Sequence, residues 1–255
     1  EGTASERYQT GAPKADASTV ALWHLDETNE ELSGDDIFDA TSNNNHGDFN
    51  GSNITTAVVD GIFGKAREFN GDDDYIEISD SSSLDITDEI TISAWVHMDQ
   101  LPENMSDPFP AVVTKSNATY RFGVYQTDSS KMGFRINYNT EDVLETDYEM
   151  TETGWVHIVA TYNGESMHLY ENGQLKASEN KTASINTDNN PILLGSGWQG
   201  AIDEVRISNI ARSAQEIEEM YRAGRRHRFS RTITTTNLSS SNKLPFYIAA
   251  DEPGT

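Results

Sequence analysis

GWVHIVATYNGESMHLYENGQL, residues 154–175, is the stretch that decides the fold class of this chain. Apolar and β-branched residues alternate along its first run, so that successive side chains point to opposite faces of a sheet. Asn-Gly pairs at 163–164 and 172–173 separate the runs. Asn-Gly between apolar runs is the strongest short signal for a β-hairpin. The stretch therefore predicts three consecutive antiparallel strands.

Short runs of the same kind recur along the chain from Val20 onward, separated by clusters of Gly, Asn, Asp and Ser. Many short strands with turn signals between them are typical of a β-sandwich or jelly roll. We therefore predict an all-β fold, a jelly-roll sandwich of two antiparallel sheets. The predicted strands are 20–26, 65–69, 74–78, 90–97, 111–115, 119–126, 131–138, 155–162, 166–171, 174–178, 192–195 and 201–208.

One segment, SAQEIEEMYRAG at 213–224, is predicted to be a short C-terminal helix. Ser213 is placed to cap its first turn, with Glu216 three residues later as the partner of a capping box. Gly224 is expected to end it, because glycine is common just after a helix. The apolar stripe of this helix consists of Ile217, Met220 and Tyr221.

Changes in composition divide the chain into three parts. Residues 1–17 are polar and are predicted to be a linker, residues 18–224 to be the jelly roll, and residues 225–255 to be a linker followed by the start of a further β module. The basic cluster at 225–228 is either a binding patch or a solvated linker. This organisation predicts that other domains of the same polypeptide flank the jelly roll.

The charge of the chain excludes some classes of partner. With 42 acidic against 18 basic residues, the net charge is −24. Nucleic acids and anionic membranes both require clustered Lys and Arg, so neither is expected as a partner. Self-repulsion of this size favours solubility, and calcium or high salt would screen it. The acidity fits either an acidic secreted protein or a protein from a salt-loving source.

The absence of cysteine excludes a disulfide scaffold and thiolate zinc sites. No apolar run approaches the length of about 20 residues that a membrane span needs, so no direct membrane contact is expected. Recognisable catalytic arrangements such as G-x-S-x-G, H-E-x-x-H and the P-loop do not occur in the sequence.

Several stretches, taken in order, resemble a known family. They are ALWHLDE (21–27), DATSNNNHG (39–47), DGIFGKAREFNGDDDYIEI (60–78), ITISAWV (90–96), GWVHIVATYNGESMHLYENGQL (154–175) and GSGWQGAIDEVRISNIARSAQEIEEMY (195–221). Together they resemble the laminin-G-like branch of the concanavalin A-like lectin/glucanase superfamily, over roughly residues 18–224. The resemblance implies a jelly roll in which the first and last strands lie close together, and an extracellular or cell-surface location.

The polar stretch DATSNNNHGDFNG, residues 39–51, offers several oxygen ligands within a short loop. Calcium takes six to eight oxygens from carboxylates, amides and backbone carbonyls. The stretch also resembles the family turn D-x-S-G-x-x-N-x-G, with Asp39 first and Gly47 last. Alternatively, Asp39 and the asparagines simply cap turns through their side chains.

A second acidic segment lies near the end of the predicted sandwich, in GAIDEVRI. The alternation of apolar residues slips at Asp203 and Glu204, which predicts a β-bulge that re-aims two carboxylates. The resemblance implies a structural calcium ion near these segments in many members of the family. The predicted ligands are Asp39, Asn44 and Asp203, with Glu27 as a further candidate.

The superfamily also contains glucanases, whose signature places three acids on one strand face as E-x-D-x-E. Here ETDYE supplies Glu145, Asp147 and Glu149, and paired carboxylates hydrolyse glycosides. The flanking residues are acidic throughout and the apolar neighbours of the enzymes are missing, so a solvated outer strand is the simpler interpretation. We therefore expect no catalysis.

The sequence thus predicts a non-catalytic module that binds a carbohydrate or a cell-surface protein, with calcium holding its loops. Trp198, on a glycine-rich loop, is the candidate aromatic platform for a sugar, and packing inside the fold is its alternative role. Trp23, Trp95 and Trp155 are expected to pack against the sheets, and His157 to be structural. A spacer domain that binds nothing remains an alternative function, and a glycan-cleaving enzyme is the third.

Overall fold

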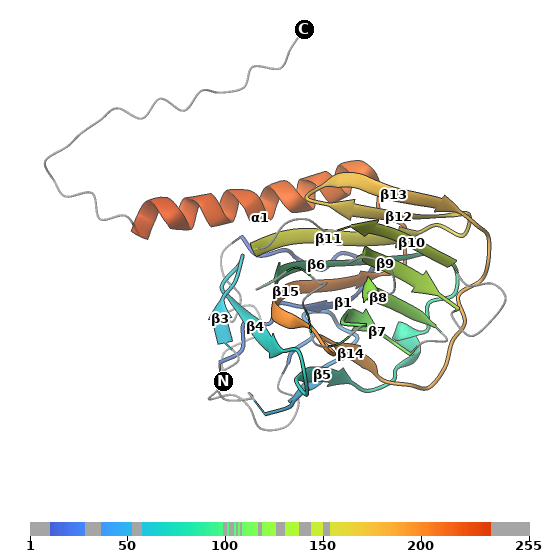
Figure 1. Ribbon diagram of the computed structural model, residues 1–255, viewed down its shortest axis with the longest axis horizontal. Helices are drawn as coiled ribbons and strands as arrows, with labels where there is room; N and C mark the ends of the chain where they lie inside the picture. Colours follow the sequence, from blue (N-terminus) through green and yellow to red (C-terminus); the bar gives the residue numbers. More distant parts are fainter. Residues whose placement is uncertain are drawn as a thin grey trace, which may run out of the picture.

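Fifteen strands and one long helix make up the part of the chain that the computed structural model describes (Figure 1). The described residues are 11–28, 37–52, 58–98, 101, 105, 107, 109–116, 119–125, 131–137, 144–149 and 154–235. The strands are β1 (Thr19–Trp23), β2 (Gly47–Asn50), β3 (Val58–Asp60), β4 (Lys65–Asn70), β5 (Tyr75–Ile78), β6 (Ile90–Met98), β7 (Ala111–Thr114), β8 (Tyr120–Tyr125), β9 (Lys131–Ile136), β10 (Leu144–Glu149), β11 (Gly154–Tyr162), β12 (Ser166–Glu171), β13 (Gln174–Asn180), β14 (Ile192–Leu194) and β15 (Gln199–Ser208). A 3-10 turn, η3 (Ser82–Leu84), precedes β6, and α1 (Ala214–Thr235) follows β15.

These strands form two antiparallel sheets, which confirms the predicted two-sheet sandwich. One sheet of eight strands has the order β13-β12-β11-β6-β15-β4-β3, with β1 also paired to β15. The other, of seven strands, has the order β10-β9-β8-β7-β14-β5-β2. The stretch 154–175 forms β11 and β12, joined at the first Asn-Gly, and the second Asn-Gly leads into β13 as predicted.

The core lies between the two sheets and follows the alternation of the strands. On β11, Val156, Ile158, Ala160 and Tyr162 are all buried in it. Their burial confirms the face predicted from the sequence. The opposite face of the same strand packs beneath α1 instead of facing water, and Val159 contacts the helix stripe there.

An aromatic cluster fills the space between the eight-stranded sheet and α1. The ring of His157 lies 5.0 Å from that of Trp95 and 6.3 Å from that of Tyr221, measured between centroids. Burial lowers the pKa of His157 to about 3, so the ring is neutral at physiological pH. Its role is structural, as predicted, and its contacts are aromatic. Ile217 of the predicted helix stripe is also buried against this sheet.

The first strand pairs with the last strand of the sandwich, as the resemblance implied. Ala21 lies opposite Ile207 in an antiparallel register. The register of β15 against β6 shifts between Asp203 and Arg206, and Glu204 has a φ angle of 54°. These features confirm the predicted β-bulge at the acidic pair.

The helix begins where predicted but does not end where predicted. Ser213 and Glu216 form the capping box: the Ser213 amide donates to Glu216 Oε2 (2.8 Å), and the Glu216 amide donates to Ser213 Oγ (3.3 Å). Gly224 does not end the helix, which continues to Thr235 and includes the basic cluster at 225–228. A Cβ atom at Gly224 would lie 2.5 Å from the ring of Trp95. The glycine therefore permits close packing instead of marking an end.

Two strands escaped the sequence prediction, namely β2 and β3. β2 has the sequence GDFN, with one apolar side chain, Phe49, that reaches the core. Its backbone pairs with β5, so it is formed by a distant partner and not by its own pattern.

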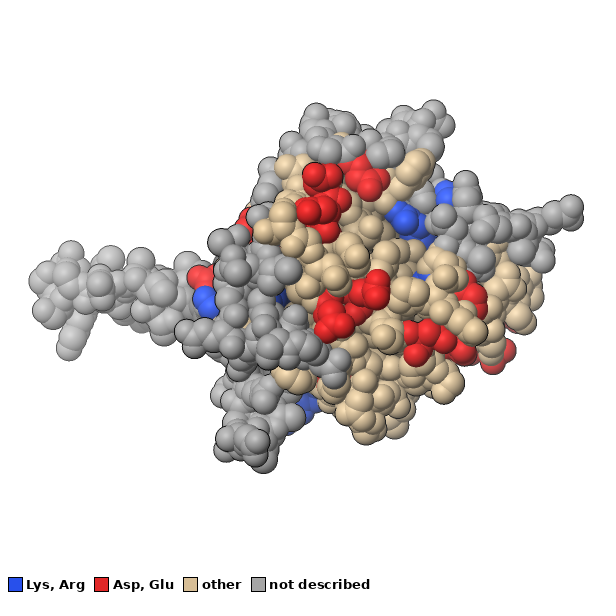
Figure 2. All heavy atoms as spheres, turned by 90° about the horizontal axis from the view of Figure 1, so that it is seen from below, with Lys and Arg blue, Asp and Glu red and all other residues tan. Residues whose placement is uncertain are grey.

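Acidic side chains gather in several groups on the face shown in Figure 2, in keeping with the large negative charge. None of the helices described here is long and apolar enough to cross a membrane.

We predict that Gly224→Ala destabilises the protein although alanine favours helices. Alanine would gain about 1 kcal/mol of helix propensity, but its Cβ would collide with Trp95, and such overpacking costs about 1–3 kcal/mol. Urea denaturation followed by tryptophan fluorescence measures the difference. The exposed Arg226→Ala is the matched control and should leave the midpoint within error. A Gly224→Ala protein more stable than the wild type would contradict the packing role.

Candidate functional site

In the loop at 39–45, the carboxylate of Asp39, a predicted metal ligand, accepts hydrogen bonds from backbone amides instead. Asp39 Oδ1 accepts from the amides of Leu22 (3.0 Å) and Thr41 (2.9 Å). Asp39 Oδ2 accepts from Thr41 Oγ1 (2.6 Å) and the Asn45 amide (3.0 Å). Both oxygens therefore hold hydrogen bonds that fix the loop against β1. This is the capping role that the sequence left as the alternative to metal binding.

The asparagines of this loop differ in their roles. Asn44, a predicted metal ligand, is exposed and its Nδ2 donates to the Ser42 carbonyl (3.1 Å). Its φ angle is 54°, a left-handed backbone conformation that Asn tolerates. Asn43 Nδ2 donates to the Val20 carbonyl (2.7 Å). The backbone carbonyl of Asn45 accepts from the indole of the buried Trp23 (2.8 Å).

Asp203 lies on the bulge of β15 and is fully buried. Its Oδ2 accepts from the amides of Ile62 (2.6 Å) and Phe63 (3.2 Å), and its Oδ1 has no hydrogen-bond partner in the described part of the chain. Burial, and then the negative charge of Glu204, raise the pKa of Asp203 well above its usual range. A buried carboxylate oxygen of this kind is one that a cation would stabilise.

Glu204, the second acid of the bulge, faces His24 of the first strand's end. Its two oxygens lie 2.8 and 3.0 Å from His24 Nδ1. Burial and the nearby charge of Asp26 raise the pKa of Glu204, while burial lowers the pKa of His24 to about 4. Asp26 accepts from the Lys65 amide, so three acids gather where β1 and the 61–65 turn meet β15.

Glu27 was the further candidate ligand and is also buried. Its Oε1 accepts from the Phe38 amide (2.9 Å), and its Oε2 has no hydrogen-bond partner among the described residues. Burial raises the pKa of Glu27, and the charge of Arg67 opposes that shift. The Arg67 guanidinium donates to the Glu27 carbonyl (2.7 Å).

The predicted calcium ligands do not form one ready-made site. Over the described residues, no group of three or more His, Asp or Glu side chains is arranged to hold a metal ion. Asp39 caps the 39–45 loop, Asn44 faces solvent, and Asp203 caps the 61–63 turn. A cation at Asp203 would therefore need backbone carbonyls among its ligands, which calcium commonly accepts.

Trp198 does not present an exposed ring. It has no exposed area and belongs to the core between the sheets. Its Nε1 lacks a hydrogen-bond partner in the described part of the chain. The packing role therefore replaces the aromatic platform for a sugar. The glycines beside Trp198 suggested a surface loop, but the Trp198 ring packs inward, between the two sheets.

The ETDYE segment forms β10, the edge strand of the seven-stranded sheet. Its register places Glu145 opposite Arg135 and Glu149 opposite Lys131 on β9, with Asp147 opposite Gly133. In this register two of the three acids lie opposite basic residues, a cross-strand pairing typical of neighbouring antiparallel strands. Its position at the end of the strand order is the one predicted for an outer strand.

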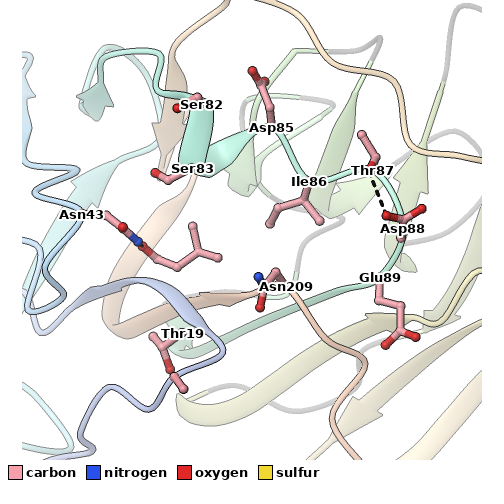
Figure 3. Close-up of a pocket in the computed structure, with 12 residues that line it drawn as sticks. Thr19, Asn43, Ser82, Ser83, Asp85, Ile86, Thr87, Asp88, Glu89 and Asn209 are labelled. Atoms are coloured by element: carbon pink, nitrogen blue, oxygen red, sulfur yellow. Dashed lines mark hydrogen bonds between the residues drawn. The ribbon is translucent and has the colours of Figure 1, made fainter.

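A pocket of about 460 Å³ lies where the 39–45 loop meets the start of β1 and the segment before β6. Hydroxyl, amide and carboxylate groups dominate its wall, and Val20 and Ile86 add apolar surface. Figure 3 shows Ile86 and Asn209 facing each other, with Asn43 on one side. The lining residues are Ala17, Thr19, Val20, Asn43, Ser82, Ser83, Asn209 and residues 85–89.

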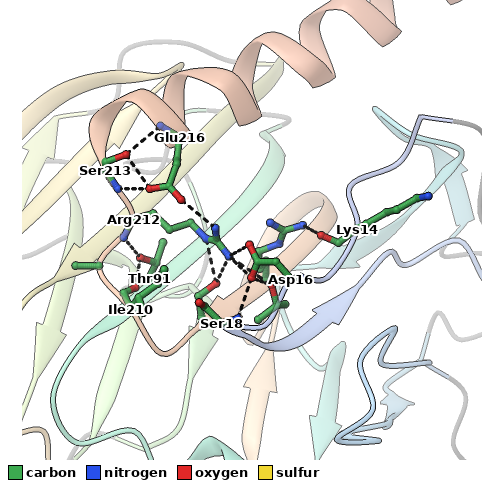
Figure 4. A network of polar contacts seen from close by, with 12 residues as sticks. Lys14, Asp16, Ser18, Thr91, Ile210, Arg212, Ser213 and Glu216 are labelled. Carbon is green, nitrogen blue, oxygen red and sulfur yellow. Dashed lines mark hydrogen bonds and ion pairs between the residues drawn. The ribbon is translucent and has the colours of Figure 1, made fainter.

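One wall of this pocket is held by a polar network around Arg212 (Figure 4). The Arg212 guanidinium donates to both oxygens of Asp16 (2.9 and 2.8 Å) and to Ser208 Oγ (3.0 Å). Arg206 donates to the Lys14 carbonyl (2.9 Å). Part of the segment predicted to be a linker is thus fastened to the sandwich, beside the pocket residues Thr19 and Asn209.

Of the residues that line the pocket, the sequence pointed only to Asn43, which belongs to the polar stretch at 39–51. The others come from segments far apart in the chain, and only the fold brings them together. One signal was available: SSSLDITDE at 81–89 is a polar run between two predicted strands.

Two facing antiparallel sheets with a polar pocket at their loops define a lectin-like jelly roll. The chain belongs to the concanavalin A-like lectin/glucanases superfamily, whose laminin-G-type family matches residues 70–218. No curated protein sequence matches the chain.

Solved structures of low sequence identity share the fold. The binding domain of Paraclostridial Mosquitocidal Protein 1 is 19% identical (TM-score 0.61), over 80% of this chain and 52% of that one. Domain 4 of AbnA, an extracellular arabinanase of Geobacillus stearothermophilus in complex with arabinotriose, is 22% identical (TM-score 0.60), over 81% and 100%. The binding domain of botulinum neurotoxin DC in complex with SialylT is 16% identical (TM-score 0.59), over 82% and 52%. This chain thus spans about half the length of the toxin binding domains it matches.

We predict that Asp39→Asn destabilises the protein by about 2–3 kcal/mol, because an amide nitrogen would face backbone donors at one side of the cap. Chemical denaturation measures the loss. The exposed Asp48→Asn removes the same charge from β2 and serves as the control. A loss for Asp39→Asn that disappears in the presence of chelator would instead identify Asp39 as a metal ligand.

Proposed function

We propose that this protein is a non-catalytic, ligand-binding module of a larger extracellular or cell-surface protein, and that its ligand is a glycan bound in the pocket. The single observation behind the proposal is the pocket itself. Its wall combines amides, hydroxyls and carboxylates with a small apolar surface, which suits the hydroxyl and C–H groups of a sugar.

The structural neighbours support the same class of function. The arabinanase domain was solved with arabinotriose, and a toxin binding domain with SialylT. The binding domain of the same toxin was also solved with rat synaptotagmin II, a protein ligand. A protein ligand is therefore the alternative occupant, and a glycan is favoured here because the pocket is small and polar.

Binding to a printed glycan array, followed by calorimetry with the strongest binder, tests the proposal. Asn209→Ala removes an exposed amide from the pocket, and we expect a loss of affinity of about fivefold, equivalent to one hydrogen bond of about 1 kcal/mol. Asn209→Trp should abolish binding, because an indole would fill the space facing Ile86.

Asn180→Ala, an exposed asparagine on the edge strand β13 and outside the pocket lining, is the matched control and should bind as the wild type does. Thermal melting shows that each variant is folded. Binding that survives Asn209→Trp would place the ligand elsewhere, and an array without binders would overturn the glycan proposal in favour of a spacer or a protein-binding module.

We also propose that calcium stabilises the module at the bulge of β15, with Asp203 as the residue that would hold it. The support is chemical: a buried carboxylate oxygen lacks a hydrogen-bond partner, and Glu204 and Asp26 add negative charge nearby. A bound divalent cation would offset this charge, and its remaining ligands would be backbone carbonyls and water.

We predict that the wild-type melting temperature rises by about 5 °C or more when calcium is raised to 100-fold above its Kd, because binding to the native state alone stabilises it. Asp203→Asn should lose this response while remaining folded, since the substitution removes a buried charge. Asp39→Asn should keep the response. Equal wild-type melting temperatures in calcium and in chelator would remove the calcium proposal.

A further inference from the structure

We infer that the pocket selects uncharged sugars and excludes anionic ones. This inference rests on the proposed function and names the class of glycan that the pocket would bind. Three carboxylates line the pocket, from Asp85, Asp88 and Glu89. Among the described residues, the lining contains no Lys or Arg. The described lining side chains therefore present negative charge to a bound sugar, and the Arg212 guanidinium behind Thr19 is already paired with Asp16.

The ammonium group of Lys115, which pairs with the lining residue Asp85, is already occupied. Lys115 is buried, with 1% of its side chain exposed, and its Nζ pairs with Asp80 and, at 3.2 Å, with Asp85. Figure 3 shows the Asp85 side chain turned away from Ile86 and Asn209. Lys115 therefore neutralises carboxylates within the protein instead of offering a positive charge to a ligand.

Asp88 and Glu89, the two remaining acids of the lining, keep acceptor capacity. Glu89 Oε2 accepts from the Ala211 amide (3.1 Å), and Asp88 Oδ2 accepts from Thr87 Oγ1 (3.0 Å). Each carboxylate has a second oxygen, and ionised carboxylates only accept hydrogen bonds. Sugar hydroxyls supply the matching donors.

A sialic acid, a uronic acid or a sulfated sugar would bring its own acceptors and a like charge to this wall. Like charges brought together across an interface without a counter-charge reject the wrong ligand more effectively than a missing contact does. The net charge of −24 adds a long-range repulsion, which salt screens. The local repulsion persists at higher salt because the charges lie close to each other.

The test uses an array of neutral oligosaccharides, each printed beside its sialylated, sulfated or uronic counterpart, and calorimetry on the strongest pair. We expect the neutral member to bind more tightly by a factor of about five or more for each added negative charge. Asp88→Asn/Glu89→Gln should reduce this ratio. Glu165→Gln/Glu179→Gln changes the net charge equally at exposed positions outside the pocket and should leave the ratio as it is.

The outcomes separate the two levels of the proposal. Anionic members that bind as tightly as neutral ones, through a pocket that Asn209→Trp blocks, would overturn the selection and leave the glycan function standing. A ratio that shifts equally in both double variants would show that net charge, and not the pocket wall, discriminates, and would also overturn it. No binding by any printed sugar would overturn the glycan function and the selection with it.

Discussion

Antiparallel pairing between the first strand and the last strand of the sandwich is the constraint on which the other features depend. β1 is buried along its whole length and pairs with β15, which in turn pairs with β6 and β4. This closure brings residues 16–19 beside 208–212, where Arg212 holds Asp16. The wall of the pocket and the start of α1 follow from it, because both lie at the end of β15.

The same closure places acids where water cannot reach them. The bulge at Asp203 and Glu204 allows β15 to pass both β1 and β6, and it turns two carboxylates inward. Amides of the 61–63 turn and the ring of His24 satisfy part of their hydrogen-bonding capacity. Burying carboxylates without full compensation costs free energy, and this cost is the physical basis of the cation that we propose at the bulge.

Local pattern was enough to predict most strands, because each has its own alternation or apolar run. It was not enough for β2, which depends on β5 for its pairing, or for the end of α1. Gly224 carries the signal of a helix end, yet close contact with Trp95 explains the glycine equally well, and only tertiary structure separates the two. The prediction that Trp198 offers an exposed ring to a sugar was wrong for the same reason. The bulge was predictable because its phase slip is visible in the sequence; the pocket was not, since its walls meet only after folding.

The polar opening loop shows why composition alone misidentifies a ligand site. Its Asp and Asn residues suggested cation ligands, yet Asp39 accepts four hydrogen bonds from the loop and from β1. A loop that crosses the end of a sandwich leaves many backbone amides without strand partners, and such side chains are the means of satisfying them. Polar side chains that are not used to satisfy backbone amides, such as that of Asn209 at the pocket, are the better candidates for binding a ligand.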